Sequence, residues 1–294
     1  MSAAAGKGAD GEGRGAATGL VLLGVASVQC GSAAATTLFD ELGPGGAVFV
    51  RTIVAAAILL AIWRPRRRAI AAARRDVVLF GLVLAGMNFS FYLALDRLPL
   101  GIAVTFEFAG PLAVAILASR SRLDFVWAGL AATAVILLAP QIGDGLDALG
   151  VAFALSAATF WAFYILLSAR VGRGPAGNGG LAVAMAVGTV ALLPFGIAGG
   201  GADLFDPALL AVGAAVGVLS SAIPYTAEIE ALKRLPEGTF GVLLSLEPAF
   251  AALVGLIALD QGLAPQEVIA IGLVVVASAG AVSTAPGLEP APEA

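Results

Sequence analysis

Long apolar stretches recur through almost the whole chain, and they restrict its fold more than any other feature. A helix needs about 20 predominantly apolar residues to cross a bilayer, and ten stretches meet this need. Only 12% of the 294 residues are charged, about half the fraction usual in soluble proteins. The sequence therefore predicts an all-α polytopic membrane protein with ten transmembrane helices. These helices are expected near residues 18–38, 44–63, 76–96, 100–118, 124–140, 148–169, 178–198, 207–231, 238–259 and 265–284.

Positively charged residues fall almost entirely on one side of this predicted bundle. If the N-terminus is cytoplasmic, Arg97 is the one basic residue in the predicted outer loops. Because cytoplasmic loops of membrane proteins are enriched in Lys and Arg, both termini are predicted to be cytoplasmic. The terminal segments 1–17 and 285–294 are rich in Gly or Pro and are expected to be disordered tails. The cytoplasmic basic residues are then Lys7, Arg14, Arg64, Arg66, Arg67, Arg68, Arg74, Arg75, Arg120, Arg122, Arg170, Arg173, Lys233 and Arg234.

Two segments of the chain repeat each other at one constant offset. LDRLPLGIAVTFEFAGPLAVAI begins at Leu95, and LKRLPEGTFGVLLSLEPAFAAL begins at Leu232. Their matched positions include Pro111 and Pro248. If each half of the chain holds five helices, the second half enters the membrane in the opposite direction. Such inverted repeats commonly form transporters, with the substrate site near the bilayer midplane. The two predicted five-helix repeats are residues 18–140 and 148–284.

The composition excludes most kinds of enzyme site. The chain has no His and a single cysteine, Cys30, so neither the usual zinc ligand sets nor a His-based catalytic triad can form. Paired mid-helix Asp residues are missing too. We therefore expect no catalytic residues, no cofactor, no metal and no nucleic-acid partner, with membrane lipid as the surroundings. An intramembrane enzyme is only a remote alternative.

An ionisable group inside a bilayer is costly and needs a partner or a wet cavity. Glu107 lies one helical turn before Pro111, which cannot donate a hydrogen bond to the Glu107 carbonyl. Pro248 frees the Leu244 carbonyl in the same way, beside Glu247. Each acid and its freed carbonyl can accept an ammonium group, a proton or a polar side chain of a substrate. The alternative is a kinked packing helix with a neutral, hydrogen-bonded glutamate.

Further ionisable groups within the predicted spans have several interpretations. Arg51 lies at a depth similar to that of Glu107, so it can pair with that residue, bind a substrate carboxylate or extend to the outer surface. Glu228 and Glu230 are two residues apart and point in different directions on a helix. Tyr225 shares a face with Glu228, which favours Glu228 as the inward residue. An ion pair with basic residues at the cytoplasmic end is the alternative.

Polar side chains at helical spacing occur in three other predicted spans. Asn88 and Tyr92 are four residues apart and share a face. Two further stripes follow the i, i+3, i+7 pattern of a helix face. Together with the acids, these groups predict a polar cavity with aromatic walls, although interhelical hydrogen bonding can explain any one of them. The stripes are Gln29, Ser32 and Thr36 in the first span and Trp161, Tyr164 and Ser168 in the sixth.

Several motifs resemble the threonine/homoserine exporter branch of the EamA-type transporters, which belong to the drug/metabolite transporter superfamily. They are PLGIAVTFEFAGPLAVAI from Pro99, IPYTAEIEALKRLP from Ile223 and TFGVLLSLEPAFAAL from Thr239. Shorter matches extend the similarity over nearly the whole chain between the tails. The resemblance implies ten helices in two inverted repeats, and amino acid export across the bacterial inner membrane by alternating access. The matching positions, implied to bind substrate, are Gln29, Asn88, Tyr92, Glu107, Trp161, Tyr164, Tyr225, Glu228 and Glu247.

The sequence departs from the family pattern at two places. Glu230 stands where an apolar residue is expected. Asp260 and Gln261 replace the Gly-Glu pair that is usual at the end of the ninth helix. The missing acid puts in doubt any mechanism that depends on it.

These features together predict the export of small amino acids, such as threonine or homoserine, from the cytoplasm to the periplasm. The substrate amine would meet oxygen atoms near Glu107 or Glu247, and its carboxylate would meet Asn88, Tyr92 or backbone donors. Proton coupling through a glutamate and uncoupled efflux both stay open, as do a monomer and a homodimer. The alternative is a transporter of the same fold for other cargo, such as aromatic amino acids, drugs or nucleotide sugars.

Overall fold

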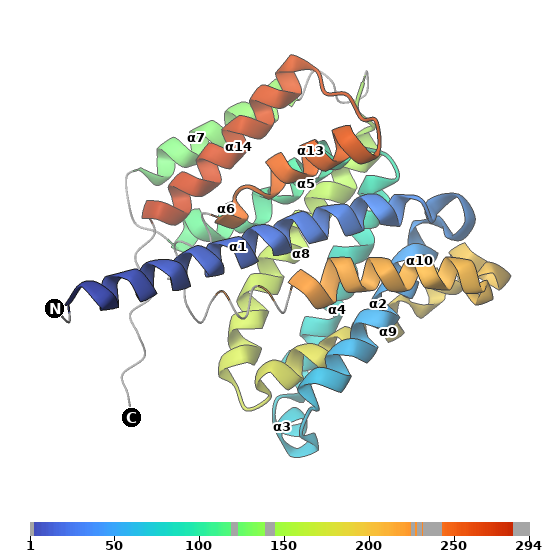
Figure 1. Cartoon of the computed structure of the whole chain (residues 1–294). Coiled ribbons are helices and arrows are strands. Elements are labelled where there is room, and N and C mark those ends of the chain that lie inside the picture. The colour runs from blue at the N-terminus through green and yellow to red at the C-terminus, as the bar shows by residue number, and fades with distance from the viewer. Residues whose placement is uncertain are drawn as a thin grey trace.

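Helices make up every regular element in the part of the chain that the structure describes. The structure is a computed structural model, and it describes residues 3–118, 123–138, 145–224, 227, 231 and 243–284. Figure 1 shows these helices packed against one another, with α1 crossing the face turned to the viewer. The predicted all-α fold class is therefore confirmed.

The helices follow one another with short connections. The first half of the chain contains α1 (Ala3–Thr36), α2 (Phe39–Trp63), α3 (Arg67–Ala72), α4 (Arg74–Leu95), α5 (Leu100–Glu107), α6 (Ala109–Ala118) and α7 (Asp124–Leu138). The second half contains α8 (Ala148–Arg173), α9 (Gly177–Gly200), the 3-10 helix η2 (Gly201–Phe205), α10 (Pro207–Gly217), the π-helix η3 (Val218–Ala222), α13 (Glu247–Ala258) and α14 (Pro265–Thr284).

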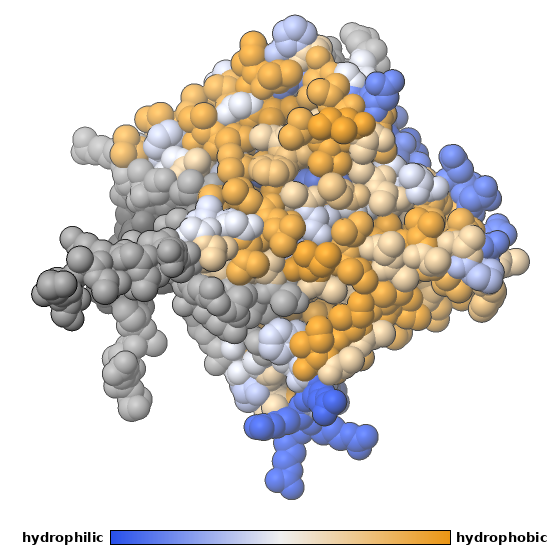
Figure 2. Space-filling model, viewed as in Figure 1, coloured by the Kyte–Doolittle hydropathy of each residue, from blue (hydrophilic) through white to orange (hydrophobic). Residues whose placement is uncertain are grey.

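Five helices, α1, α2, α4, α8 and α9, contain segments that are long and apolar enough to cross a membrane. Five shorter apolar helical segments lie at the other predicted positions. Large apolar side chains cover much of the outer surface (Figure 2), and Leu117, Phe125 and Ile257 are each at least 75% exposed. An apolar surface of this extent belongs in lipid rather than in water. The ten-span count, the inverted repeat and the cytoplasmic termini stay predictions.

Small residues let the helices of this bundle approach one another closely. A Cβ atom at Gly81 of α4 would lie only 2.5 Å from the carbonyl oxygen of Ala184 on α9. Membrane helices commonly associate through such small-residue contacts, because lipid supplies no hydrophobic force between them. Helix α4 also packs on α2, α5 and α8, and it therefore connects the two halves of the chain.

Two helix breaks occur at matched positions of the two repeated segments. Phe108 forms a turn between α5 and α6, three residues before Pro111. Ser245 and Leu246 form a turn immediately before α13, and Ser245 precedes Pro248 by the same three residues. Pro248 lies in the first turn of α13, where the missing N–H group costs nothing. The breaks thus precede the prolines rather than coincide with them.

Helix α1 begins at Ala3 and runs through the segment expected to be a disordered tail. The alanines of this segment favour helix. The helix in the structure therefore begins before residue 18, where the first span was predicted to start. The basic loop after α2 also differs from a simple turn, because it contains the short helix α3. The C-terminal segment 285–294 lies outside the described residues.

Candidate functional site

Helices α1, α2, α4 and α5 each bury polar side chains. These side chains include those of Gln29, Arg51, Asn88, Tyr92 and Glu107. All of these positions were singled out in the sequence because they place polar groups within apolar helices. Their burial in the described structure makes them the strongest candidates for a substrate site, since buried polar groups need partners.

The guanidinium group of Arg51 stacks over the ring of Tyr92, with its central carbon 5.4 Å from the ring centroid. Tyr92 is held in turn by Phe39, whose ring centroid lies 5.7 Å away. A cation over an aromatic face is attracted by the ring quadrupole. The Nε atom of Arg51 and the hydroxyl of Tyr92 have no hydrogen-bond partner among the described residues.

Glu107 is the last residue of α5, directly before the turn at Phe108. No ion pair within 4.0 Å joins its carboxylate to Arg51 in the described structure. Arg51 is only 7% exposed, which favours a position inside the bundle over one at the outer surface. The pair with Glu107, the binding of a substrate carboxylate and the extension to the surface all stay predictions.

The two aromatic residues expected to line the site from α8 contact different neighbours. Trp161 meets Phe108 edge to face, with ring centroids 5.3 Å apart. Trp161 therefore lies beside the helix break that follows Glu107. Tyr164 packs on Phe80 at 5.5 Å, within a separate apolar cluster. Tyr164 and Trp161 therefore pack in different clusters, although they lie on the same helix.

Several other predicted residues are satisfied within their own helices. The side-chain amide of Asn88 donates to the carbonyl of Leu84 at 2.7 Å. The hydroxyls of Thr36 and Ser168 donate to carbonyls three residues earlier. By contrast, the Oε1 atom of Gln29 is buried without a partner among the described residues.

Three of the predicted residues in the second half fall outside the described part of the chain, and a fourth lies near its edge. Tyr225, Glu228 and Glu230 lie outside the described residues. Glu247 is the first residue of α13 and is partly buried. An acidic side chain at a helix N-terminus is favoured by the helix dipole, which gives Glu247 a structural reason for its position.

Two buried serines were not predicted. Ser220 and Ser221 lie in η3, where the N–H of Ile223 bonds to the carbonyl of Val218, five residues earlier. Both hydroxyls are buried and have no hydrogen-bond partner in the described structure. Adjacent hydroxyls in an otherwise apolar span were the available sequence signal. Short π-helical turns occur frequently at functional sites.

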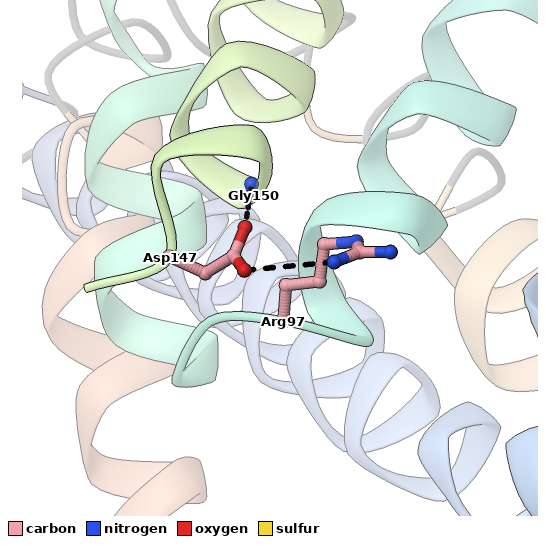
Figure 3. Close-up of polar contacts among 3 residues, drawn as sticks. All are labelled: Arg97, Asp147 and Gly150. Carbon is pink, nitrogen blue, oxygen red and sulfur yellow. Dashed lines mark hydrogen bonds and ion pairs between the residues drawn. The ribbon is translucent and has the colours of Figure 1, made fainter. Parts of the chain in front are cut away.

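At the C-terminal end of α4 and the N-terminal end of α8, polar contacts join the two halves of the chain. Arg97, after α4, pairs with Asp147 at 3.5 Å, and Asp147 also accepts a hydrogen bond from the Gly150 N–H at the start of α8 (Figure 3). The Gln261 side-chain oxygen accepts from the backbone N–H of Leu100 at 2.9 Å. This bond needs an acceptor but no charge, so an amide fills the position where the family pattern has an acid.

A small pocket of about 30 Å³ lies between α5, α6, α7 and α14. Nearly all of its lining is apolar, and the hydroxyl of its one polar residue, Thr105, already donates to Gly101 within α5. It therefore offers no polar partner for a zwitterion and differs from the cluster around Arg51.

Comparison with known proteins decides the family. The EamA-like transporter family matches residues 148–283. The threonine/homoserine exporter RhtA of Escherichia coli (strain K12) is 40% identical over 270 residues, which span 90% of each chain. The chain belongs to the EamA-like transporter family. The threonine/homoserine exporter RhtA of Salmonella typhimurium (strain LT2) shows the same identity and coverage.

A solved structure supports the fold of this EamA-like transporter. A crystal structure of a protein that is 19% identical superposes with a TM-score of 0.59, covering 91% of this chain and 97% of that one. The resemblance seen in the sequence is confirmed. The relatives are named exporters, not enzymes, so the chain is a membrane transporter and the enzyme alternative is wrong.

Proposed function

We propose that this EamA-like transporter exports small amino acids such as threonine and homoserine from the cytoplasm to the periplasm. The names of the two relatives support this substrate class. In this proposal the protein lies in the bacterial inner membrane, with ten spans in two inverted repeats and both termini in the cytoplasm. The strong bias of Lys and Arg in the sequence supports that orientation.

One observation carries the proposal: Arg51 and Glu107 are a buried base and a buried acid that no direct ion pair joins in the described structure. An α-amino acid is a zwitterion with complementary charges. Its carboxylate would bind the N–H groups of Arg51, and its ammonium group would bind Glu107. Burying a charge is costly unless it is paired, so a ligand that pairs both groups at once is strongly favoured.

The other polar residues complete this proposed site. Tyr92 holds Arg51 in place, and the free oxygen of Gln29 and the hydroxyl of Tyr92 are further hydrogen-bonding groups. Trp161 forms an aromatic wall beside the break at Phe108. Asn88, Tyr164, Tyr225, Glu228 and Glu247 stay candidates for the transport path.

Alternating access would use the two matched helix breaks. The turn at Phe108 divides one span into α5 and α6, and the turn at Ser245 directly precedes α13. Discontinuous helices commonly carry the substrate sites of such transporters. Small rotations at these turns would open the site to one side at a time. Coupling to protons through Glu107 and uncoupled efflux are both compatible with this arrangement.

A transport screen tests the proposal. The protein would be reconstituted into liposomes, and uptake of labelled threonine and homoserine would be compared with uptake of aromatic amino acids and of cationic drugs. We expect saturable flux of the two small hydroxy amino acids above that of protein-free liposomes. Flux of aromatic amino acids or drugs alone, or no flux of any amino acid, would overturn the substrate assignment.

A further inference from the structure

The π-helix η3 carries the two adjacent serines whose buried hydroxyls have no partner in the described structure. Ser221 is 1% exposed and Ser220 is 5% exposed. A buried hydroxyl without a partner loses its bonds to water and gains nothing in return. Neither serine is needed to satisfy the π-helical turn, because the carbonyl of Val218 already accepts from Ile223. The hydroxyls are therefore available to a ligand.

Contacts on both sides fix the position of this turn. On the α1 side, the Ser27 hydroxyl donates to the carbonyl of Leu219 at 2.7 Å. Any Cβ atom at Gly31 would overlap the hydroxyl of Ser220, so α1 lies directly against this serine. Ser27 and Gly31 share one face of α1, whereas Gln29 lies on a different face.

On the α2 side, the turn adjoins the residue that we expect to bind the substrate carboxylate. A Cβ atom at Gly217 would lie 3.0 Å from the carbonyl oxygen of Arg51. Because a π-helical turn holds more residues than an α-helical turn, Ser221 returns to the face occupied by Gly217. It lies roughly 6 Å further along the helix axis, on the side away from Pro207, where α10 begins.

We propose that Ser220 and Ser221 form a subsite that recognises the hydroxyl group on the side chain of the transported amino acid. With the substrate carboxylate at Arg51, a small side chain extends along α2 toward η3. There its hydroxyl donates to one serine and accepts from the other. The inference rests on the proposed function and adds the selectivity for hydroxy amino acids over apolar ones of equal size.

Matched pairs of substrates test this subsite in proteoliposomes. Valine replaces the hydroxyl of threonine by a methyl group, and norvaline does the same for homoserine. The ratio of threonine flux to valine flux, measured at low substrate concentration, would be compared in the wild type, Ser220→Ala, Ser221→Ala and the double variant. We expect the double variant to lower this ratio by about tenfold or more, because a site built to bind a hydroxyl rejects the analogue without it.

Thermal stability separates recognition from a structural role. Removing an unpartnered buried hydroxyl should leave the melting temperature in detergent unchanged or raised. Ser27→Ala is the matched control, because the Ser27 hydroxyl lies at the same interface but already donates to the Leu219 carbonyl. This variant should lower the melting temperature and leave the flux ratio unchanged. A double variant that transports amino acids with the wild-type ratio would overturn the subsite. Absence of amino acid flux in the wild type would instead overturn the proposed function.

Discussion

The guanidinium carbon of Arg51 lies 5.4 Å from the centre of the Tyr92 ring, within a part of the bundle that both residues share with Glu107. The contact stabilises a buried positive charge. The Nε atom of Arg51 has no hydrogen-bond partner in the described structure, so this group is available to a ligand while Tyr92 holds the guanidinium in place.

Substitution of Tyr92 separates the contribution of the ring from that of the hydroxyl. Tyr92→Phe keeps the ring, and Tyr92→Leu removes it. A cation–π contact contributes about 0.5–2 kcal/mol, so threonine affinity should fall roughly 2- to 30-fold more in Tyr92→Leu than in Tyr92→Phe. Affinity is measured as the concentration for half-maximal exchange in proteoliposomes. Equal values for the two variants would show that the ring does not hold Arg51.

Gly110 allows the broken helix to lie close to α8. A Cβ atom there would overlap the carbonyl oxygen of Ala158. Gly110→Ala should therefore lower stability by about 1–3 kcal/mol, as overpacking usually does. Gly129 of α7 is the control, because no atom of the described residues lies within 4 Å of its added Cβ atom. Gly129→Ala should preserve or raise the melting temperature in detergent, and equal effects of the two substitutions would contradict the close approach.

Gln261 links the loop before α14 to the start of α5 through the Leu100 N–H. Because the bond requires only an oxygen acceptor, Gln261→Glu should keep both folding and transport. Gln261→Leu should lower stability by about 1–3 kcal/mol, since the N–H group loses its partner. The check is thermal unfolding together with threonine flux. Loss of flux in Gln261→Glu alone would show that charge at this position matters.

Asp147 has two roles that substitutions can separate. It caps α8 through the Gly150 N–H and pairs with Arg97, and both charged side chains are about 40% exposed, at 36% for Arg97 and 42% for Asp147. Removing a cap costs about 1 kcal/mol, whereas an exposed ion pair contributes little. Asp147→Ala should therefore lower the melting temperature more than Arg97→Ala. The reverse order in the same buffer would mean that the ion pair dominates.

The class of the protein and the placement of its helices could be predicted from the sequence. Long apolar runs interrupted by Gly and Pro leave few other solutions in a bilayer. The spacing of the polar residues on α4 was informative as well. Asn88 and Tyr92 are four residues apart, so they were predicted to share a helix face, and both are buried in the structure.

Other features depend on tertiary contacts that no local pattern encodes. The π-helical turn at Val218–Ala222 depends on the Ser27 hydroxyl and on the space beside Gly31. Trp161 and Tyr164 follow one stripe, yet they meet Phe108 and Phe80 in different clusters. The stacking of Arg51 on Tyr92 was equally hidden, because the sequence could not distinguish among an ion pair, a ligand and an extended arginine.

The central claim is that Glu107 receives the amine of the substrate while Arg51 receives its carboxylate. Glu107→Gln keeps the shape of the side chain and removes the ionisable carboxyl group. Glu267→Gln is a suitable control, because Glu267 is also a buried acid but its carboxylate accepts from the Ala264 N–H at the start of α14, a bond that an amide oxygen can also accept.

The most direct measurement is threonine exchange in proteoliposomes that contain equal amounts of folded wild type, Glu107→Gln or Glu267→Gln protein. A hydrogen bond to a charged group contributes about 1.5–3 kcal/mol, so Glu107→Gln should reduce exchange at low threonine concentration by about tenfold or more. Glu267→Gln should exchange threonine like the wild type. Wild-type exchange in Glu107→Gln would contradict the account and reduce Glu107 to a packing residue at the helix break.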